Sequence, residues 1–305
     1  MVRYILRRIV QAGICLLGIS VIVFSLSHLS GDPALLMAPP EAKPEDIEAL
    51  RVMLGLDKPL HIQFWLFISK AVQGDFGESV RWGKPCLEVW LMRFPNTLLL
   101  GVAAMMFTLV VGIPTGILSA VRAGGWFDNF GKAFALAGQS MPVFWVGLML
   151  ILIFSVTLRW LPTSGIDSWQ HLIMPSFTLG WYFTSAITRL TRSAMLDILD
   201  SEYIKMARIK GVPEFLVILK HGFRNAMIPV VTLAALNIVT LLNGTVITET
   251  VFNWPGIGRL IVDSIFARDY PMVQTCVLIA SGLFISANLF VDILYAYIDP
   301  RIKYH

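Results

Sequence analysis

TLLLGVAAMMFTLVVGIPTGILSAV, residues 97–121, is the stretch that decides the fold, because it contains no charged side chain. A helix of about 20 mostly apolar residues spans the hydrocarbon of a bilayer and satisfies its own backbone polar groups. Five further stretches qualify, and they fall at about 9–29, 133–158, 172–190, 229–251 and 272–296. The sequence therefore predicts an all-α integral membrane protein with six transmembrane helices.

The composition fits a chain that is surrounded largely by lipid. Of the 305 residues, 56% are hydrophobic and 14% are charged, and the mean hydropathy is +0.71. A soluble domain carries about 25% charged residues. The composition therefore excludes a soluble enzyme. We expect the net charge of +4 to act through the side of the membrane on which each charge lies, not through nucleic-acid binding.

The first apolar stretch is predicted to be a retained anchor helix within residues 1–30. Arg3, Arg7 and Arg8 precede it, as basic residues precede the apolar core of a signal peptide. The stretch 9–29 is longer than the usual core of about 7–15 residues, and no small-x-small cleavage site follows it.

The distribution of Lys and Arg predicts the orientation. With the N-terminus inside, fourteen basic residues lie in inside segments and ten in outside segments, and seven of those ten lie in one long loop. Long loops count little in the positive-inside rule. We therefore expect both termini and segment 191–228 in the cytoplasm, and an insertion at 31–95 outside.

Several motifs of other functions are incomplete. Segment 125–132 resembles a phosphate-binding loop, but the glycine spacing is one residue too long and Ala133 replaces the magnesium-binding hydroxyl. The triplet 75–77 matches the kinase metal-binding sequence without its companion motifs. The cysteines form no Cys-x-x-Cys pair, and the histidines are scattered. We expect no catalytic residues, no metal site and no nucleotide bound by this chain.

The polar segment DSEYIKMARIKG, residues 200–211, predicts a short helix with both ends specified. Asp200 or Ser201 can cap its start, and Gly211 can supply a left-handed stop. Pro213 can open a second helix that reaches about Asn225. Helical spacing in this second helix predicts an apolar stripe made of Val212, Phe215, Leu216, Leu219, Gly222 and Phe223.

This helix pair has an apolar face, made of Tyr203, Met206 and Ala207, which we expect to contact either lipid or another protein. One reading is a basic amphipathic segment that rests on anionic lipid headgroups. The other is a docking surface for a partner protein. Periodicity alone favours neither reading.

The residues of this segment resemble a known motif. Glu202-Tyr203, Ala207, Gly211, His221, Arg224-Asn225-Ala226 and Pro229 resemble the EAA loop by which permeases of ABC importers engage their ATPases, in the form typical of peptide permeases. The resemblance continues through stretches 1–8, 31–33, 54–59, 75–79, 140–142, 161–162, 171–176, 252–259, 268–271 and 299–301. The chain is similar to the first of the two permeases in dipeptide, oligopeptide, glutathione and nickel importers.

The resemblance implies an architecture and a set of partners. It implies a type I importer core at 96–299, behind the anchor helix and the insertion, and a cytoplasmic tail at 300–305. The implied partners are a second homologous permease, two ATP-binding subunits that carry ATP and magnesium, and a periplasmic solute-binding protein, in the bacterial inner membrane. The implied ATPase-coupling residues are Glu202, Tyr203, Met206, Ala207, Gly211, His221 and Asn225.

The fifth predicted span is unusually polar. Glu249 lies near its external end, where a charged group favours a structural pair with Arg259 or Arg268, or a gating role, over direct cargo contact. The other polar positions either line a water-filled path or form hydrogen bonds between helices. The candidates for a translocation path or gate are Asn237, Asn243, Thr248 and Glu249.

Small residues in other spans have a simpler interpretation. Gly112 and Gly116 are predicted to be close-packing points between helices. The competing class for the whole chain is a passive channel or a membrane-embedded enzyme, which predicts no ATPase partner. The identity of the cargo does not follow from the sequence.

Overall fold

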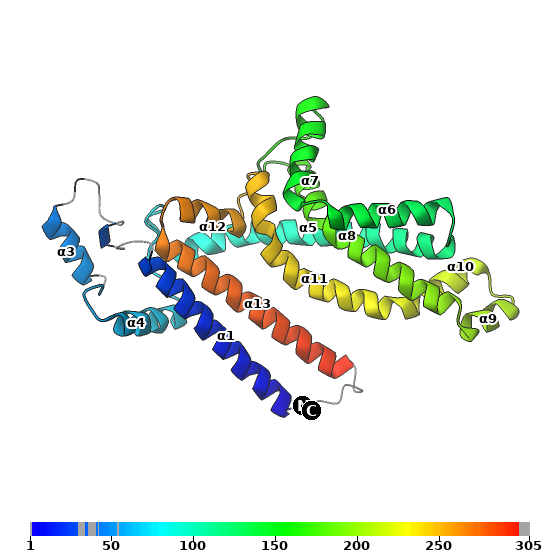
Figure 1. Cartoon of the computed structure of the whole chain (residues 1–305), viewed down its shortest axis with the longest axis horizontal. Coiled ribbons are helices and arrows are strands. Elements are labelled where there is room, and N and C mark those ends of the chain that lie inside the picture. Colours follow the sequence, from blue (N-terminus) through cyan, green and yellow to red (C-terminus); the bar gives the residue numbers. More distant parts are fainter. Residues whose placement is uncertain (1, 30–33, 36–40, 42, 54, 299–305) are drawn as a thin grey trace. The chain divides into compact units, whose positions relative to one another are not determined.

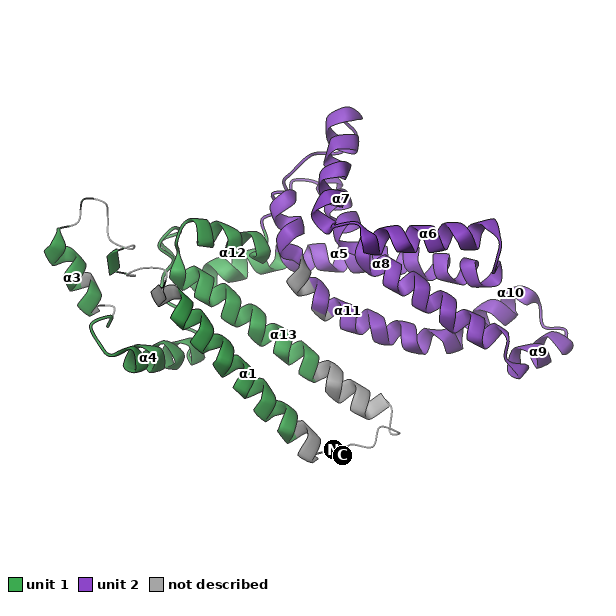
Figure 2. Cartoon of the chain, viewed as in Figure 1, with its two compact units in different colours: residues 1–95, 256–305 green, residues 96–255 purple. Residues whose placement is uncertain are grey.

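The computed structural model describes residues 2–29, 34–35, 41, 43–53 and 55–298, so the predicted tail at 300–305 and motif 31–33 lie outside the described residues. Within these ranges the chain is helical, and the strand-like pairing consists of an isolated bridge between Glu78 and Pro85. Two compact units are formed, residues 1–95 with 256–305 and residues 96–255 (Figure 2). Each unit is described by itself below.

Unit 1 joins the two ends of the chain. Its helices are α1 (Val2–Leu29), α3 (Pro44–Met53), α4 (Leu60–Val72), the first part of α5 (Cys86–Val121), α12 (Ile257–Phe266) and α13 (Tyr270–Ile298). Helix α1 packs along α13 (Figure 1). The buried core consists of Cys86, Val89, Trp90, Ile257, Leu260, Met272 and Cys276.

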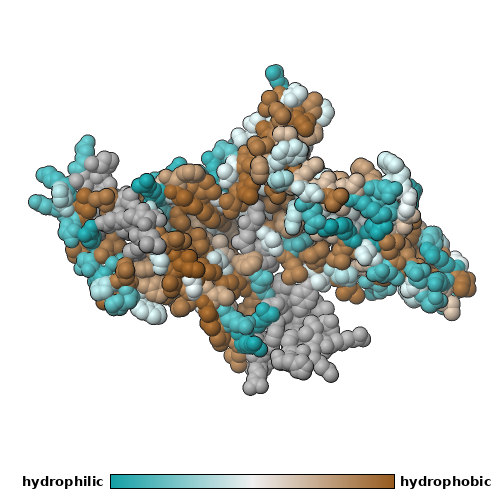
Figure 3. All heavy atoms as spheres, in the orientation of Figure 1, coloured by the Kyte–Doolittle hydropathy of each residue, from teal (hydrophilic) through white to brown (hydrophobic). Residues whose placement is uncertain are grey.

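Unit 2 is a bundle around α8. Its helices are the rest of α5, α6 (Trp126–Ser140), α7 (Val143–Leu150), the π-helix η1 (Ile151–Thr157), α8 (Gln170–Leu199), α9 (Glu202–Ile209), α10 (Glu214–Leu216), the π-helix η2 (Val217–Phe223) and α11 (Arg224–Val251). Helix α8 packs against α6, α7 and α11. Figure 3 shows hydrophobic side chains over much of the visible surface, and hydrophilic ones around α3 and at the α9–α10 end.

Not all of the six predicted spans are found by length and composition among the described residues. By length and composition, four described stretches can cross a membrane: Leu6–Leu26, Cys86–Val121, Glu214–Ile238 and Tyr270–Leu289. A fifth candidate is the pair α6 and α7–η1, which bends by 107° at the break before Val143. The predicted single span 133–158 is therefore a bent pair, because Pro142 interrupts the helix.

The predicted span 172–190 lies inside α8 but is not apolar enough to count as a candidate. Its sequence is rich in hydroxyl side chains, and Thr178, Thr184, Ser185 and Thr188 are all buried within unit 2. A helix enclosed by other helices meets protein instead of lipid, so it need not have an apolar surface all round.

Helices α5 and α8 approach each other through glycines. A Cβ atom added at Gly112 would lie 3.0 Å from Ile187 Cγ2, and one added at Gly116 would lie 2.6 Å from Thr191 Cβ. From the α8 side, the carbonyl of Gly180 accepts a hydrogen bond of 3.1 Å from Thr108 Oγ1. The prediction that Gly112 and Gly116 are close-packing points is confirmed.

We expect Gly116→Leu to destabilise the permease by about 3 kcal/mol or more, at the upper end of the cost of overpacking. A Cβ there would also lie 2.7 Å from the Thr188 carbonyl oxygen, a backbone atom that cannot rotate away. Gly18→Leu in α1 is the matched control, because a Cβ at Gly18 meets nothing within 4 Å. Thermal unfolding of the purified importer measures both, and equal melting temperatures would contradict the close approach.

Candidate functional site

Helix α9 ends where the sequence predicted. Gly211 has φ +75°, in the left-handed region that favours glycine. Its N–H donates to the Arg208 carbonyl at 3.0 Å, and the Val212 N–H donates to the Ala207 carbonyl at 3.2 Å. These two bonds form a Schellman motif, and Val212 packs against the neighbouring apolar cluster. The predicted left-handed stop at Gly211 is confirmed.

The start of α9 differs from the prediction. Ser201 occupies the N-cap position with an extended backbone, but neither its side chain nor that of Asp200 caps the helix. The Ser201 hydroxyl donates instead to the Ile198 carbonyl at 2.6 Å. The last carbonyls of α8 lack helical partners and compete for this donor. Glu202 accepts a bond of 2.9 Å from Lys205 Nζ, and this bond raises the pKa of Lys205.

The second helix does not end at Asn225 as predicted. Helix α10 follows Pro213, runs into the π-helix η2, and continues directly into α11. The π-helix buries Val217 and Gly222, which are five residues apart, whereas Phe215, a member of the predicted stripe, is exposed. The predicted stripe is wrong at Phe215, Leu216 and Leu219, which are exposed. It holds at Gly222, which is buried, and at Val212 and Phe223, which pack against buried clusters. The α-helical period that it assumed does not continue through η2, because a π-helix forms i→i+5 hydrogen bonds.

Two links tie α9 to the residues that follow it. The Tyr203 hydroxyl lies within hydrogen-bond distance of His221 Nδ1, and Asn225 Nδ2 donates to the His221 carbonyl at 2.9 Å. Across the Gly211 turn, Arg208 binds both carboxylate oxygens of Glu214, at 2.7 and 3.2 Å, which raises the pKa of Arg208. Bidentate pairs of this kind fix geometry as well as adding energy. Together with the buried contacts of Ile204 and Ala207 against Val217, these links position α9 on η2.

The coupling residues predicted from the resemblance divide between two faces. Tyr203 is 53% exposed and Met206 is 57% exposed, so both contribute to an apolar outer face. Ala207 is buried and packs with Ile204 and Val217. The inner face joins α9 to η2, and the outer face is available to a partner.

The candidate path residues lie largely inside unit 2. Glu249 is buried and accepts a hydrogen bond of 2.7 Å from Thr97 Oγ1 on α5. Asn237 and Thr248 are also buried, on the same helix α11. The side chain of Asn243 lies outside the described residues. The burial places these residues between helices of the unit.

The sequence analysis missed a charged cluster in unit 2. The Asp128 carboxylate is buried, receives Arg192 Nε at 2.6 Å and Lys132 Nζ at 2.8 Å, and accepts the Gly124 N–H at 2.9 Å. This cluster joins α6 to α8 near the turn that precedes α6. One feature of the sequence could have indicated this cluster: Asp128 and Arg192, which have opposite charges, each lie just outside a predicted apolar stretch.

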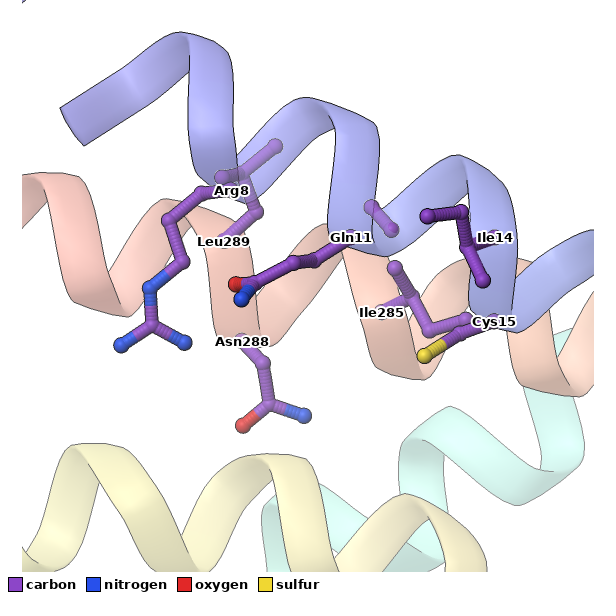
Figure 4. Close-up of a pocket in the computed structure, with 8 residues that line it drawn as sticks. Arg8, Gln11, Ile14, Cys15, Ile285, Asn288 and Leu289 are labelled. Atoms are coloured by element: carbon purple, nitrogen blue, oxygen red, sulfur yellow. The ribbon is translucent and has the colours of Figure 1, made fainter. Parts of the chain in front are cut away.

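One groove lies away from these residues. It measures about 410 Å³ and lies between α1 and α13 of unit 1, with Arg8, Gln11 and Asn288 among its polar lining residues (Figure 4). It contains none of the predicted site residues. Over the described residues, no group of three His, Cys, Asp or Glu side chains could hold a metal ion.

The membrane-length helices and the short helix α9 agree with the permease class that the sequence resembles. Residues 112–304 match the family described as "Binding-protein-dependent transport system inner membrane component", and residues 1–100 match "Binding-prot-dependent transport system membrane comp, N-term". The chain belongs to this family and is the permease subunit of an ABC importer of the peptide and glutathione class.

Individual relatives agree over the full length. The "Glutathione transport system permease protein GsiC" of Salmonella paratyphi A is 49% identical over 305 residues, and that of Escherichia coli (strain K12) is 48% identical, with all of both chains covered in each case. An inward-facing structure of the MetNI methionine ABC transporter has a TM-score of 0.57 at 18% identity, covering 69% of this chain and 96% of that one, which shows the shared fold.

Family membership settles several predictions. The chain is a component of the bacterial inner membrane and works in an importer with ATPase and solute-binding partners. It is a transport component, and separate subunits hydrolyse ATP. The competing class, a membrane enzyme or passive channel, is excluded.

Proposed function

We propose that this chain pairs with a second, homologous permease and, with two ATP-binding subunits, moves glutathione or a similar small peptide into the cytoplasm. The cargo arrives on a periplasmic binding protein. Full-length relatives at 48–49% identity that are named as glutathione permeases support this choice of cargo.

The braced helix α9 carries the proposal. An element that transmits force needs a fixed orientation and a surface for its partner, and α9 has both. Tyr203 and Met206 face outward, while His221 and Gly211 hold the helix in place. Asn225 acts indirectly, through its hydrogen bond to the His221 carbonyl. We assign Glu202, Tyr203 and Met206 to contact with the ATPase, and Ala207, Gly211, His221 and Asn225 to positioning α9. ATP and magnesium are bound by the ATPases.

For Glu249 we propose a structural or gating role. Its burial against Thr97 joins α11 to α5 within unit 2. We assign Asn237 and Thr248 to polar contacts between helices as well, because they too are buried in this unit. A pair between Glu249 and Arg259 or Arg268 stays a prediction, as does a path role for Asn243.

The proposal is tested by transport in liposomes that contain the whole importer with its binding protein. We expect uptake of labelled glutathione that requires ATP and all subunits. Uptake of dipeptides without glutathione would overturn the cargo and leave the permease role intact. Glutathione flux down its gradient without the ATPases would overturn the proposed coupling.

The proposed topology places both termini and the tail at 300–305 in the cytoplasm, together with segment 191–228, and the insertion 31–95 outside. In a Cys15→Ser background, since Cys15 is the exposed one of the described free cysteines, we expect Glu45→Cys to react with an impermeant thiol reagent. Cells must lack the outer-membrane barrier. Lys205→Cys should react only after the inner membrane is opened, and the reverse pattern would contradict the topology.

A further inference from the structure

Helix α4 is an apolar helix that lies at the surface of unit 1. Its sequence LHIQFWLFISKAV is mostly apolar, yet none of its residues is buried. At 1.5 Å per residue it is about 20 Å long, too short to cross a hydrocarbon layer of about 30 Å. An apolar helix of this length is either a buried core helix or an interfacial one. The exposure of α4 removes the first alternative within unit 1.

The contacts of α4 place it near the end of a candidate membrane span. The Phe24 ring of α1 lies 5.5 Å from the Phe64 ring and 6.1 Å from the Phe67 ring, between centroids. Phe24 is two residues from the end of the candidate span Leu6–Leu26, which corresponds to about 3 Å along the helix axis. Helix α4 therefore contacts α1 close to the C-terminal end of its candidate span. Figure 1 shows that α4 turns away from the line of α1.

The opposite face of α4 is exposed and apolar. Trp65 is 60% exposed and Val72 is 83% exposed, and Ile62 and Leu66 lie exposed on the same side. Tryptophan favours the membrane interface because its large apolar ring carries one polar N–H. Helix α1 likewise carries exposed apolar side chains, among them Leu17, Val21, Ile22 and Leu26.

Polar contacts hold α4 in place at its start, and a turn ends it. Gln63 Nε2 donates to the Leu56 carbonyl at 3.0 Å and to the Lys58 carbonyl at 2.7 Å, which fixes the turn before the helix. The helix stops before Gly74, whose φ is +83°. This turn and the contact of Phe64 and Phe67 with Phe24 together orient the exposed face.

We propose that α4 lies in the membrane interface, with Ile62, Trp65, Leu66 and Val72 in contact with phospholipid next to the end of α1. Because α4 contacts α1 near the end of a candidate membrane span, the occupant of this exposed apolar face is lipid. Helix α4 then holds the segment between α1 and α5 against the membrane surface. The proposed topology, with segment 31–95 outside, implies that α4 contacts the outer leaflet. The rest of the inference does not depend on the topology.

The test measures membrane depth in liposomes that contain the complete importer. Nitroxide labels are placed at Trp65→Cys and, separately, at Val72→Cys, in the Cys15→Ser background. Collisions with oxygen, which enters lipid, are compared with collisions with a water-soluble nickel chelate. We expect the oxygen-to-nickel ratio at both positions to be at least about threefold above that at Glu45→Cys in α3, since an interfacial helix inserts about 5–10 Å.

Val21→Cys in α1 gives the reference ratio for a side chain inside a span. A ratio at positions 65 and 72 equal to that at 45 would overturn the proposal, because the face would be in water. Protection from both reagents would also overturn it, because a protein partner would then cover the face. ATP-driven uptake measured in the same liposomes reports the proposed transport function separately. Two labelled positions keep the test valid if one variant fails to assemble.

Discussion

Gly211→Val should reduce uptake per assembled permease roughly 5- to 30-fold. A left-handed backbone costs a residue with a Cβ atom about 1–2 kcal/mol, which changes the population of the correctly placed α9 by that factor. The Schellman bonds to Ala207 and Arg208 depend on this conformation. Uptake is measured in liposomes that contain the whole importer and normalised to permease that carries bound ATPase.

Gly124→Val is the matched control for Gly211→Val. Gly124 has φ +76°, and a Cβ there meets nothing within 4 Å, as at Gly211. The two variants carry the same local strain, but Gly124 lies in the turn between α5 and α6. We expect Gly124→Val to transport nearly as well as the native protein. Equal losses in both variants would mean that strain, and not the placement of α9, limits transport.

Glu202→Lys tests the outer surface of α9 without backbone strain. The Glu202 side chain is 88% exposed, so its replacement removes little packing. If α9 seats in an ATPase, reversing this charge weakens the association or separates ATP hydrolysis from uptake. If α9 rests on anionic lipid, the added positive charge strengthens that contact by about 1 kcal/mol and uptake is unchanged. Full uptake with normal ATPase content would refute the assignment of Glu202.

Asp128→Ala should lower the free energy of unfolding by about 2–4 kcal/mol. Removing one partner of a buried ion pair leaves the other charge uncompensated, at a typical cost of about 3–5 kcal/mol. The expected loss extends below that range, because the side chains of Arg192 and Lys132 are 24% and 49% exposed and water partly compensates their charges. Unfolding of the purified importer in a denaturing detergent measures the change.

Glu88→Ala is the control for Asp128→Ala, because it breaks an ion pair with Lys84 in which both side chains are about half exposed. Exposed pairs contribute about 0–1 kcal/mol. A comparable loss in the two variants would show that burial of the Asp128 cluster adds no stability. The double variant Asp128→Ala with Arg192→Ala should recover part of the loss, because no buried charge is then left alone.

Local chemistry explains which parts of the site the sequence predicted. The stop at Gly211 depends on one backbone angle and on neighbours within four residues, so the glycine alone indicated it. The membrane-spanning character of α1, α5 and α13 followed from apolar length, a property of each segment by itself.

Contacts between distant residues explain what the sequence did not predict. The π-helix around Gly222 packs close to Met195 of α8, whose Cε would lie 3.3 Å from a Cβ at Gly222. The pair of Asp128 and Arg192 joins residues 64 positions apart. Neither arrangement leaves a periodic signal. Burial of the α8 side chains depends on the helices around them, and the hydropathy of the α8 sequence contains no information about those helices. The sequence therefore predicted the location of a span at 172–190 but not that other helices enclose it.

The pairing of α1 with α13 determines the order in which the two units can form during synthesis. A ribosome adds about 5–20 residues per second, so roughly 10–50 s separate the synthesis of Leu29 from that of Tyr270. Unit 2 is continuous in sequence, from Asn96 to Pro255, and is therefore fully synthesised before unit 1 can close. During this interval α1 has to persist in the bilayer without its partner helix. Its candidate span Leu6–Leu26 allows this, because lipid itself solvates the face that α13 later covers.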